Sequence, residues 1–172
     1  MSASDSVSHG RAPKGTGERV CVFIDLANVM KTAAGTCDLD LDLDSMVHEL
    51  LNGRRLVAKY VFDGDAGDAS IRLRDLERRG YEVRTGCRLE NGKQKGVDVE
   101  MGLTMLKHAM DDDMDVAVVV SGDADFVPAV EMVRECGKAV EVASFKNGLS
   151  KGMRIGDRTW ILDELPIMKI GG

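Results

Sequence analysis

The chain is short of aromatic residues, of proline and of closely spaced cysteines, and each shortage excludes a class of protein. Only 4% of its 172 residues are aromatic and only three are proline, whereas 44% are hydrophobic and 30% charged, a balance typical of a globular domain. The four cysteines are scattered without a CxxC spacing, which argues against a disulfide framework and against a zinc site built from cysteines. Cys21 and Cys136 stand in apolar surroundings, so we expect both in the core.

Long apolar runs are missing as well. No run approaches the roughly 18 residues that cross a bilayer. The first residues are rich in serine and glycine and contain no apolar stretch for a signal peptide. We therefore expect a cytoplasmic protein that does not contact a membrane. Residues 1–18 are expected to form a disordered tail, and residues 19–172 a single domain.

Basic residues do not dominate the chain. The formal net charge of −6 argues against a protein that wraps nucleic acid with a generally basic surface. One segment departs from this balance, with eight basic and four acidic residues from Arg72 to Lys95. It is either a strip that follows phosphates or a solvated face with local ion pairs, and the sequence leaves both open. Arg88, Lys93 and above all Lys95 are the candidates for phosphate contacts. Because few aromatic side chains are present to stack on bases, weak sequence specificity is expected.

The order of apolar and polar segments predicts strands that alternate with helices. Short runs of apolar, often β-branched residues predict strands at 20–24, 56–62, 81–84, 115–120, 139–143 and 160–162. Amphipathic stretches predict helices at 42–51, 69–79, 97–110 and 126–136, and a polar loop is expected at 86–95. Such alternation implies right-handed crossovers. The fold class is therefore α/β, a Rossmann-like three-layer sandwich around a central, mostly parallel sheet.

Acidic residues follow the ends of the predicted strands. Asp25, Asp63 and Asp123 come at or just past these ends, while Asp98 and Asp125 open helices. Ligands of open α/β sheets bind at the carboxyl ends of the strands, so these acids are expected to share one edge. For Asp125 a helix cap is as good an account as a ligand, and for Asp63 an ordinary turn is favoured. Asp25 and Asp123 end central strands, where a buried carboxylate is costly unless it is paired.

A cluster of carboxylates needs a counter-cation. Two carboxylates about 4 Å apart repel by roughly 4 kcal/mol at an effective dielectric constant of about 20. No cysteine or histidine stands in these motifs, and ligands that are all oxygen suit Mg²⁺ or Mn²⁺. A metal ion held by carboxylates commonly acts on phosphates, where it activates water for attack on phosphorus.

Three motifs follow one another along the chain: Phe23-Ile-Asp-Leu-Ala-Asn28, Lys95-Gly-Val-Asp-Val99 and Val120-Ser-Gly-Asp-Ala-Asp-Phe-Val-Pro128. In this order they resemble the NYN domain, the LabA-like branch of the PIN-domain nuclease superfamily. The resemblance runs from about Val20 to Asp163. It implies a PIN-like sandwich and a metal-dependent ribonuclease site.

The resemblance also implies roles for single residues. Asp25, Asp98 and Asp123 would be the acidic metal ligands, and Asp125 would be a fourth acid close by. Asn28 would hydrogen-bond in the site and orient Asp25 or a metal-bound water.

Further positions follow from the same resemblance. Ser121 would shape the turn that presents the acid after it, and Asp63 stands where some members carry an acid. Many relatives have a second acid in the helix after the Lys-Gly-Val-Asp motif, but this chain has Thr104 there. Glu100, one turn earlier on the same helical face, is the candidate substitute.

Three functions are weighed on these grounds. The leading hypothesis is a metal-dependent endoribonuclease that hydrolyses RNA phosphodiester bonds and leaves a 5′-phosphate. The second is a catalytically weak or inactive regulatory or RNA-binding protein, favoured by Thr104 and by the acidic net charge. A phosphatase of the haloacid dehalogenase type, suggested by Asp63-Gly-Asp65, ranks third because no Thr-like turn follows. RNA is the expected partner, and a homodimer is left open.

Overall fold

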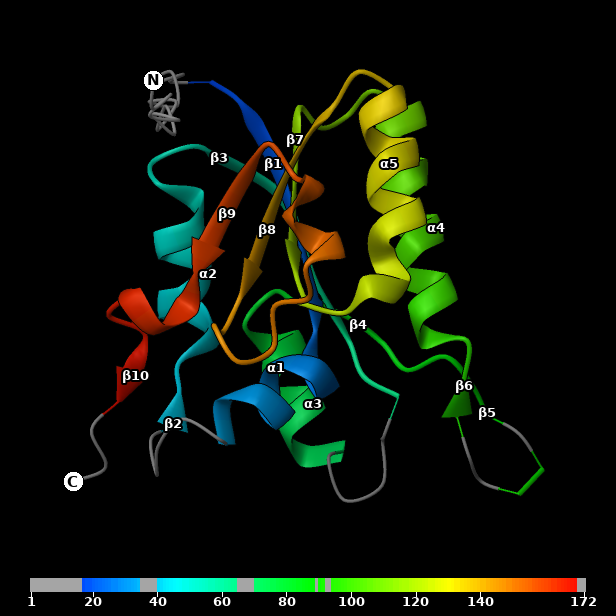
Figure 1. Cartoon of the computed structure of the whole chain (residues 1–172). Helices are drawn as coiled ribbons and strands as arrows, with labels where there is room; N and C mark the ends of the chain where they lie inside the picture. Colours follow the sequence, from blue (N-terminus) through cyan, green and yellow to red (C-terminus); the bar gives the residue numbers. More distant parts are fainter. Residues whose placement is uncertain (1–16, 35–39, 65–69, 89, 92–93, 170–172) are drawn as a thin grey trace.

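The computed structural model describes residues 17–34, 40–64, 70–88, 90–91 and 94–169. A central sheet of six parallel strands has the order β4-β3-β1-β7-β8-β9 (Figure 1). Its strands are β1 (Arg19–Asp25), β3 (Arg55–Phe62), β4 (Glu82–Arg84), β7 (Val116–Val120), β8 (Ala139–Ser144) and β9 (Arg158–Ile161). The sheet predicted as mostly parallel is thus parallel throughout. Apart from Gly17 and Glu18, the predicted tail lies outside the described residues.

Helices cover both faces of the sheet, which gives the predicted three layers. The helices on one face are α1 (Leu26–Ala34), α2 (Leu43–Leu51) and α3 (Ser70–Arg78). Those on the other face are α4 (Val97–Met110) and α5 (Val127–Glu135). Two antiparallel pairs lie outside the main sheet: β2 (Asp40–Leu41) with β10 (Met168–Lys169), and β5 (Cys87–Arg88) with β6 (Gln94–Lys95). No helix in these described ranges is long and apolar enough to cross a bilayer.

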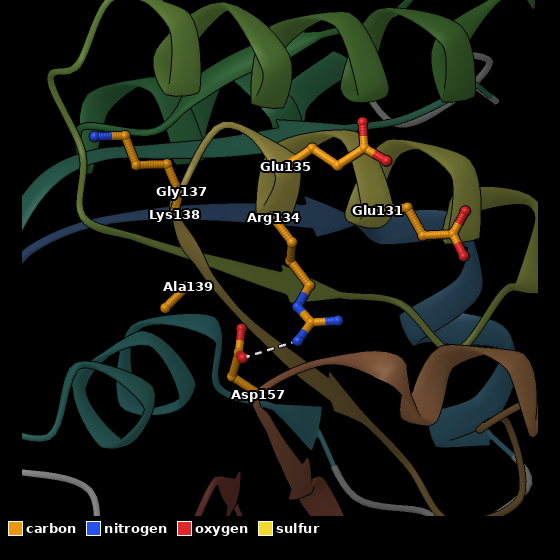
Figure 2. Close-up of a pocket in the computed structure, with 7 residues that line it drawn as sticks. All are labelled: Glu131, Arg134, Glu135, Gly137, Lys138, Ala139 and Asp157. Carbon is orange, nitrogen blue, oxygen red and sulfur yellow. Dashed lines mark hydrogen bonds and ion pairs between the residues drawn. The ribbon is translucent and has the colours of Figure 1, made fainter.

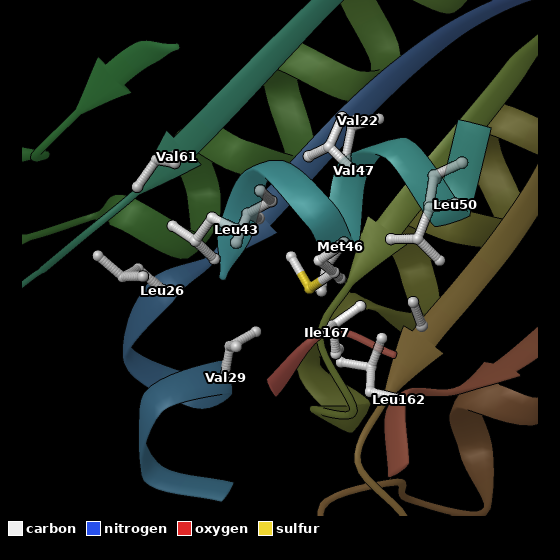
Figure 3. Packing of buried hydrophobic residues seen from close by; sticks show 14 of the residues in the cluster. Val22, Leu26, Val29, Leu43, Met46, Val47, Leu50, Val61, Leu162 and Ile167 are labelled. Carbon is white, nitrogen blue, oxygen red and sulfur yellow. The ribbon is translucent and has the colours of Figure 1, made fainter. Parts of the chain in front are cut away.

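Strand β1 lies in the middle of the sheet and is buried on both faces. Val20, Val22 and Ile24 pack into the core under α1, α2 and α3, whereas Cys21 and Phe23 pack against α4 and α5. This alternation follows from the two-residue period of a strand. Figure 3 shows how the buried side chains of α1 and α2 meet those of the sheet in the first of these cores.

Three features differ from the prediction. Helix α1 was not predicted, because it begins directly after β1 without a turn or cap; its signal is the helical spacing of the buried Leu26, Val29 and Ala33. The predicted polar loop at 86–95 contains β5 and β6, which are too short and too polar to show a strand period. Cys136 is exposed, because α5 ends at Glu135 and the chain turns there, whereas Cys21 is buried.

A buried ion pair joins the turn after α2 to strands β8 and β9. The guanidinium of Arg54 donates to both carboxylate oxygens of Glu141, at 2.8 and 2.9 Å, and the indole N–H of Trp160 donates to the same carboxylate at 2.8 Å. The Arg54 and Glu141 side chains are only 9% and 8% exposed. The Glu141 charge is therefore satisfied by Arg54 and Trp160, whereas the Arg54 guanidinium also donates to the carbonyls of Leu50 and Leu51 and lies 3.6 Å from the Glu18 carboxylate.

Replacing Arg54 by alanine would leave the buried Glu141 carboxylate without its cation. We expect Arg54→Ala to lower the free energy of unfolding by about 3–5 kcal/mol, measured by urea denaturation. The exposed neighbour Arg55 is the control, and Arg55→Ala should change stability by no more than about 0.5 kcal/mol. Equal effects of the two substitutions would contradict a structural role for the buried pair.

Candidate active site

The carboxyl ends of β1 and β7 lie next to each other where the strand order reverses. From β1 the sheet continues through β3 to β4 on one side, and from β7 it continues through β8 to β9 on the other. In Figure 1 the first turns of α1 and α4 lie at this same edge of the sheet. Open α/β sheets bind their ligands at such a switch point.

Asp25 is the last residue of β1 and is only 7% exposed. Its carboxylate accepts hydrogen bonds from the Ser121 hydroxyl at 3.1 Å and from the backbone N–H of Asn28 at 3.2 Å. The side-chain oxygen of Asn28 accepts instead from the backbone N–H of Gly122, at 3.2 Å. Asn28 thus contacts Asp25 through its backbone, while its side chain fixes the turn after β7.

That turn presents Asp123. The hydroxyl of the fully buried Ser121 accepts from the backbone N–H of Asp123 at 3.2 Å. The Asp123 carboxylate in turn accepts from the backbone N–H of Asp125 at 3.0 Å, and so caps the short 3-10 helix Ala124–Phe126. The helix cap that the sequence allowed for Asp125 is therefore made by Asp123, and Asp125 is exposed.

Asp98 approaches the same edge from the first turn of α4. Gly96 precedes this helix in the left-handed conformation, with φ of 82°, which lets the chain turn sharply into α4. Between the helix and the end of β1 lies a cavity of about 350 Å³. Its lining residues are Asp25, Ala27, Gly64, Gly96, Val97, Asp98 and Val99.

The acids at this edge interact electrostatically. Burial raises the pKa of Asp25, and repulsion from Asp98 and Asp123 raises it further, against the lowering effect of its two hydrogen bonds. The pKa of Asp98 is also raised, first by burial and then by the charges of Asp123 and Asp125. Burial and then the neighbouring charges therefore make each of these carboxylates harder to ionise, which is the situation that a bound cation relieves.

The donor set fits a hard divalent cation. The carboxylates of Asp25, Asp98 and Asp123 offer oxygen atoms from β1, α4 and the turn after β7, and Mg²⁺ and Mn²⁺ prefer oxygen ligands. Within the described part of the chain, these carboxylates do not form a group with all ligand atoms inside 4.8 Å of one another. Mg²⁺ usually keeps several waters and takes one or two carboxylates directly, so a spread set of acids suits it.

The secondary candidates lie around this cluster. Asp63 follows β3, is 6% exposed, and donates its backbone N–H to the Arg84 carbonyl at 2.9 Å, but it does not line the cavity. Glu100 lies in the first turn of α4. Its carbonyl accepts from the Thr104 hydroxyl at 2.7 Å, so Thr104 turns its one polar group back to its own helix.

The basic segment divides into paired and unpaired parts. Arg79 forms ion pairs with Asp44 and Asp75, and Arg84 forms one with Glu82. Three exposed arginines have no ion pair with another described residue: Arg72, Arg74 and Arg78.

Arg88, Lys93 and Lys95 are the other basic candidates for phosphate contacts. The backbone of Arg88 lies in β5 and that of Lys95 in β6, directly before Gly96, whereas their side chains are outside the described part of the structure. Lys93 lies outside the described residues altogether.

A larger hollow of about 740 Å³ lies at the amino end of β8 (Figure 2). Both of its basic side chains are paired: Arg134 with Asp157 at 3.2 Å, and Lys138 with Asp112 beside it. It lies at the opposite ends of the strands from Asp25. The cavity beside Asp25 is therefore the better candidate for an active site.

This fold is that of a PIN-like, Rossmann-like domain. The chain belongs to the NYN domain family, whose model matches residues 19–155.

Individual proteins that are similar to it include one curated protein and one solved structure. Uncharacterized protein MJ0482 from Methanocaldococcus jannaschii is 26% identical over 147 residues, which cover 84% of this chain and 55% of that protein. The chain thus spans about half the length of this curated relative. A protein of unknown function, VPA0982 from Vibrio parahaemolyticus, has a crystal structure with a TM-score of 0.74 at 21% identity, covering 90% of this chain and 98% of that one. At that identity the likeness shows the fold alone.

The turn that presents Asp123 has no room for a side chain at Gly122. A Cβ there would lie 2.0 Å from the carbonyl oxygen of Gly148 and 2.6 Å from the Ser144 hydroxyl. We expect Gly122→Ala to destabilise the fold by about 1–3 kcal/mol, because backbone atoms must move apart. In chemical unfolding, the control Gly102→Ala should be neutral or stabilising by up to about 1 kcal/mol, since it lies inside α4. A wild-type unfolding midpoint for Gly122→Ala would contradict the tight contact.

The raised pKa of Asp98 makes stability depend on pH with a definite sign. The folded state binds protons more tightly than the unfolded chain at this group, so the charge of Asp98 destabilises the fold above its raised pKa. We expect Asp98→Asn to raise the free energy of unfolding at neutral pH by at most about 1 kcal/mol, because the group is largely exposed and screened. The gain should shrink as the pH falls through the raised pKa and vanish below the ordinary value of 3.8.

Thermal unfolding of both proteins across this pH range, without divalent metal, measures the difference. Asp75→Asn, which removes an acid that is paired with Arg79 and is outside the cluster, should give no such gain. A stabilisation by Asp98→Asn that grows toward acid pH would show that the carboxylate is not repelled by its neighbours.

Proposed function

We propose that the protein is a divalent-metal-dependent endoribonuclease that hydrolyses RNA phosphodiester bonds. The observation that carries this proposal is the convergence of Asp25, Asp98 and Asp123, from β1, α4 and the turn after β7, at the edge of the sheet where its order reverses. Membership in the NYN family supports nuclease activity. The choice of RNA follows the ribonuclease site that the three motifs imply.

Asp25, Asp98 and Asp123 would hold Mg²⁺ or Mn²⁺, with Asp125 close by. Such an ion supplies activation of water and neutralisation of charge on a phosphate. The Ser121 hydroxyl and the Asn28 backbone hold the Asp25 carboxylate in one orientation. Because the groups are fixed before substrate binds, little reorganisation is needed during the reaction.

The shape of the cavity suits a phosphodiester backbone. Gly64 and Gly96 line it without side chains, which leaves room for a chain of phosphates beside Asp25 and Asp98. The guanidinium of Arg72 lies 3.3 Å from the Met30 sulfur on α1, so α3 presents this cation toward the helix that starts at the site.

The remaining contacts would be made with the RNA backbone. Arg74 and Arg78 are further exposed arginines on α3, and Lys95, Arg88 and Lys93, from the segment that precedes α4 in the sequence, remain candidates. Contacts of this kind give affinity that depends on salt and little on sequence. Tyr81 and Phe126 are buried and cannot stack on bases, in keeping with weak sequence specificity.

A catalytically weak or inactive RNA-binding or regulatory protein is the second candidate, and Thr104 favours it. At this position many relatives carry an acid, whereas the Thr104 hydroxyl is bonded to the Glu100 carbonyl. The site therefore has one charge less with which to hold a second ion.

Cleavage of a labelled pool of single-stranded and structured RNA tests the proposal. We expect cleavage with Mg²⁺ or Mn²⁺ and none with EDTA. Asp25→Asn and Asp123→Asn should each reduce the rate at least about 100-fold, the scale of losing one group that stabilises charge in the transition state. Asp75→Asn should retain the wild-type rate, and fragment ends should carry 5′-phosphates.

Absence of cleavage by folded wild-type protein under every metal condition would contradict the endoribonuclease. RNA binding that persists in that case would support the second candidate. Thr104→Asp, with Thr104→Asn as the uncharged control of the same shape, then tests the missing acid: cleavage by the aspartate variant alone would assign the loss to position 104.

A further inference from the structure

A second group of metal-ligating side chains lies toward the other end of β1. The Cys21 sulfur, a ring nitrogen of His108 and a carboxylate oxygen of Asp113 all lie within 4.8 Å of one another. They come from the first half of β1, the last turn of α4 and the loop before β7. Cys21 and Asp25 are four residues apart on one strand, which separates the two groups by about 13 Å at roughly 3.3 Å per residue.

We propose that Cys21, His108 and Asp113 form a zinc site that is separate from the acidic cluster. A thiolate, an imidazole and a carboxylate are the ligand types that zinc takes in proteins, whereas Mg²⁺ takes oxygen. A thiolate and a carboxylate balance the two charges of the ion, and neutral His108 adds no charge. The site is thus neutral when filled, as suits a place in the core.

The spacing of the ligand atoms agrees with a tetrahedral ion. Zinc bonds of about 2.0–2.3 Å place the ligand atoms of a tetrahedron about 3.3–3.8 Å apart. Three side chains already inside 4.8 Å need to close by only about 1 Å. Such a closure is within the reach of rotamer adjustments.

The imidazole of His108 is held in place on both sides. One ring nitrogen, Nδ1, hydrogen-bonds the Asp113 carboxylate at 2.6 Å, and the other, Nε2, hydrogen-bonds the Tyr60 hydroxyl at 2.9 Å. A metal would replace one of these bonds and leave the other to orient the ring, as outer hydrogen bonds do for zinc-bound histidines.

A metal ion would enter this group of side chains from the Asp113 side. Cys21 is fully buried, and the side chain of His108 is 14% exposed, whereas that of Asp113 is 45% exposed. An ion can therefore meet Asp113 first and the thiol last. In the bound state it would tie the last turn of α4 to β1 and to the loop before β7.

Cobalt provides the test, because Co²⁺ takes the place of zinc and reports a sulfur ligand by colour. We expect the full-length protein, stripped of metal, to develop a thiolate-to-cobalt charge-transfer band as Co²⁺ is added, besides any Co²⁺ that the acidic cluster takes up without such a band. Zn²⁺ should remove this band by displacement. Cys21→Ser should abolish it, and Cys136→Ser, at an exposed cysteine outside the group, should retain it.

Two more variants keep the test decisive. Asp113→Asn changes a half-exposed side chain, is expected to fold, and should weaken Co²⁺ binding at least about tenfold. Asp123→Asn, in the acidic cluster, should leave the band unchanged. Absence of the band in wild-type protein would overturn the zinc site. A band that survives Cys21→Ser, or one that is lost in Cys136→Ser, would also overturn it. Unaltered Co²⁺ affinity in Asp113→Asn would overturn it as well. Asp113, His108 and Tyr60 would then be a hydrogen-bonded core group only.

Discussion

The buried carboxylate of Asp25 is the constraint on which the site depends. A carboxylate at the end of a central strand would cost several kcal/mol without partners, and the fold supplies two, from Ser121 and from the Asn28 backbone. Those partners continue the chain of hydrogen bonds, since Ser121 and the Asn28 side chain both bind the turn that carries Asp123. The bonds that satisfy one buried charge therefore also set the position of a second acid.

Close packing makes one wall of the site rigid and leaves the other open. A Cβ on Gly122 would meet the Gly148 carbonyl, and a Cβ on Gly148 would meet the Thr32 side chain of α1. The Asn147 side chain donates to the Thr32 carbonyl at 3.2 Å. The loop after β8 is thereby pressed against α1 and the turn after β7. Gly64 and Gly96 line the opposite side, where no such packing exists among the lining residues. An RNA strand would approach from this open side.

The sequence was sufficient for the parts of the fold that depend on local patterns. Continuous apolar runs predicted the central strands, and the position of Asp25 directly after one of them placed it at the carboxyl edge. Helix α1 was missed because no cap or turn separates it from β1. That Asp123 and not Asp125 caps the short 3-10 helix depends on which carboxylate reaches a backbone N–H, and residue spacing does not decide that. The approach of Cys21 to His108 rests on packing between β1 and α4, for which the chain carries no spacing signal.

The two groups of ligands differ in the ions they favour, and α4 connects them. Asp25 and Asp98 offer oxygen only, which favours Mg²⁺ or Mn²⁺. Cys21 and His108 offer sulfur and nitrogen, which favour zinc. Helix α4 has 14 residues and spans about 21 Å, with Asp98 in its first turn and His108 in its last. A helix transmits a constraint along its axis, because its backbone hydrogen bonds allow little bending. An ion bound at His108 would therefore fix the carboxyl end of α4, the helix whose amino end carries Asp98. The proposed zinc site would in this way support the acidic site without contacting its substrate.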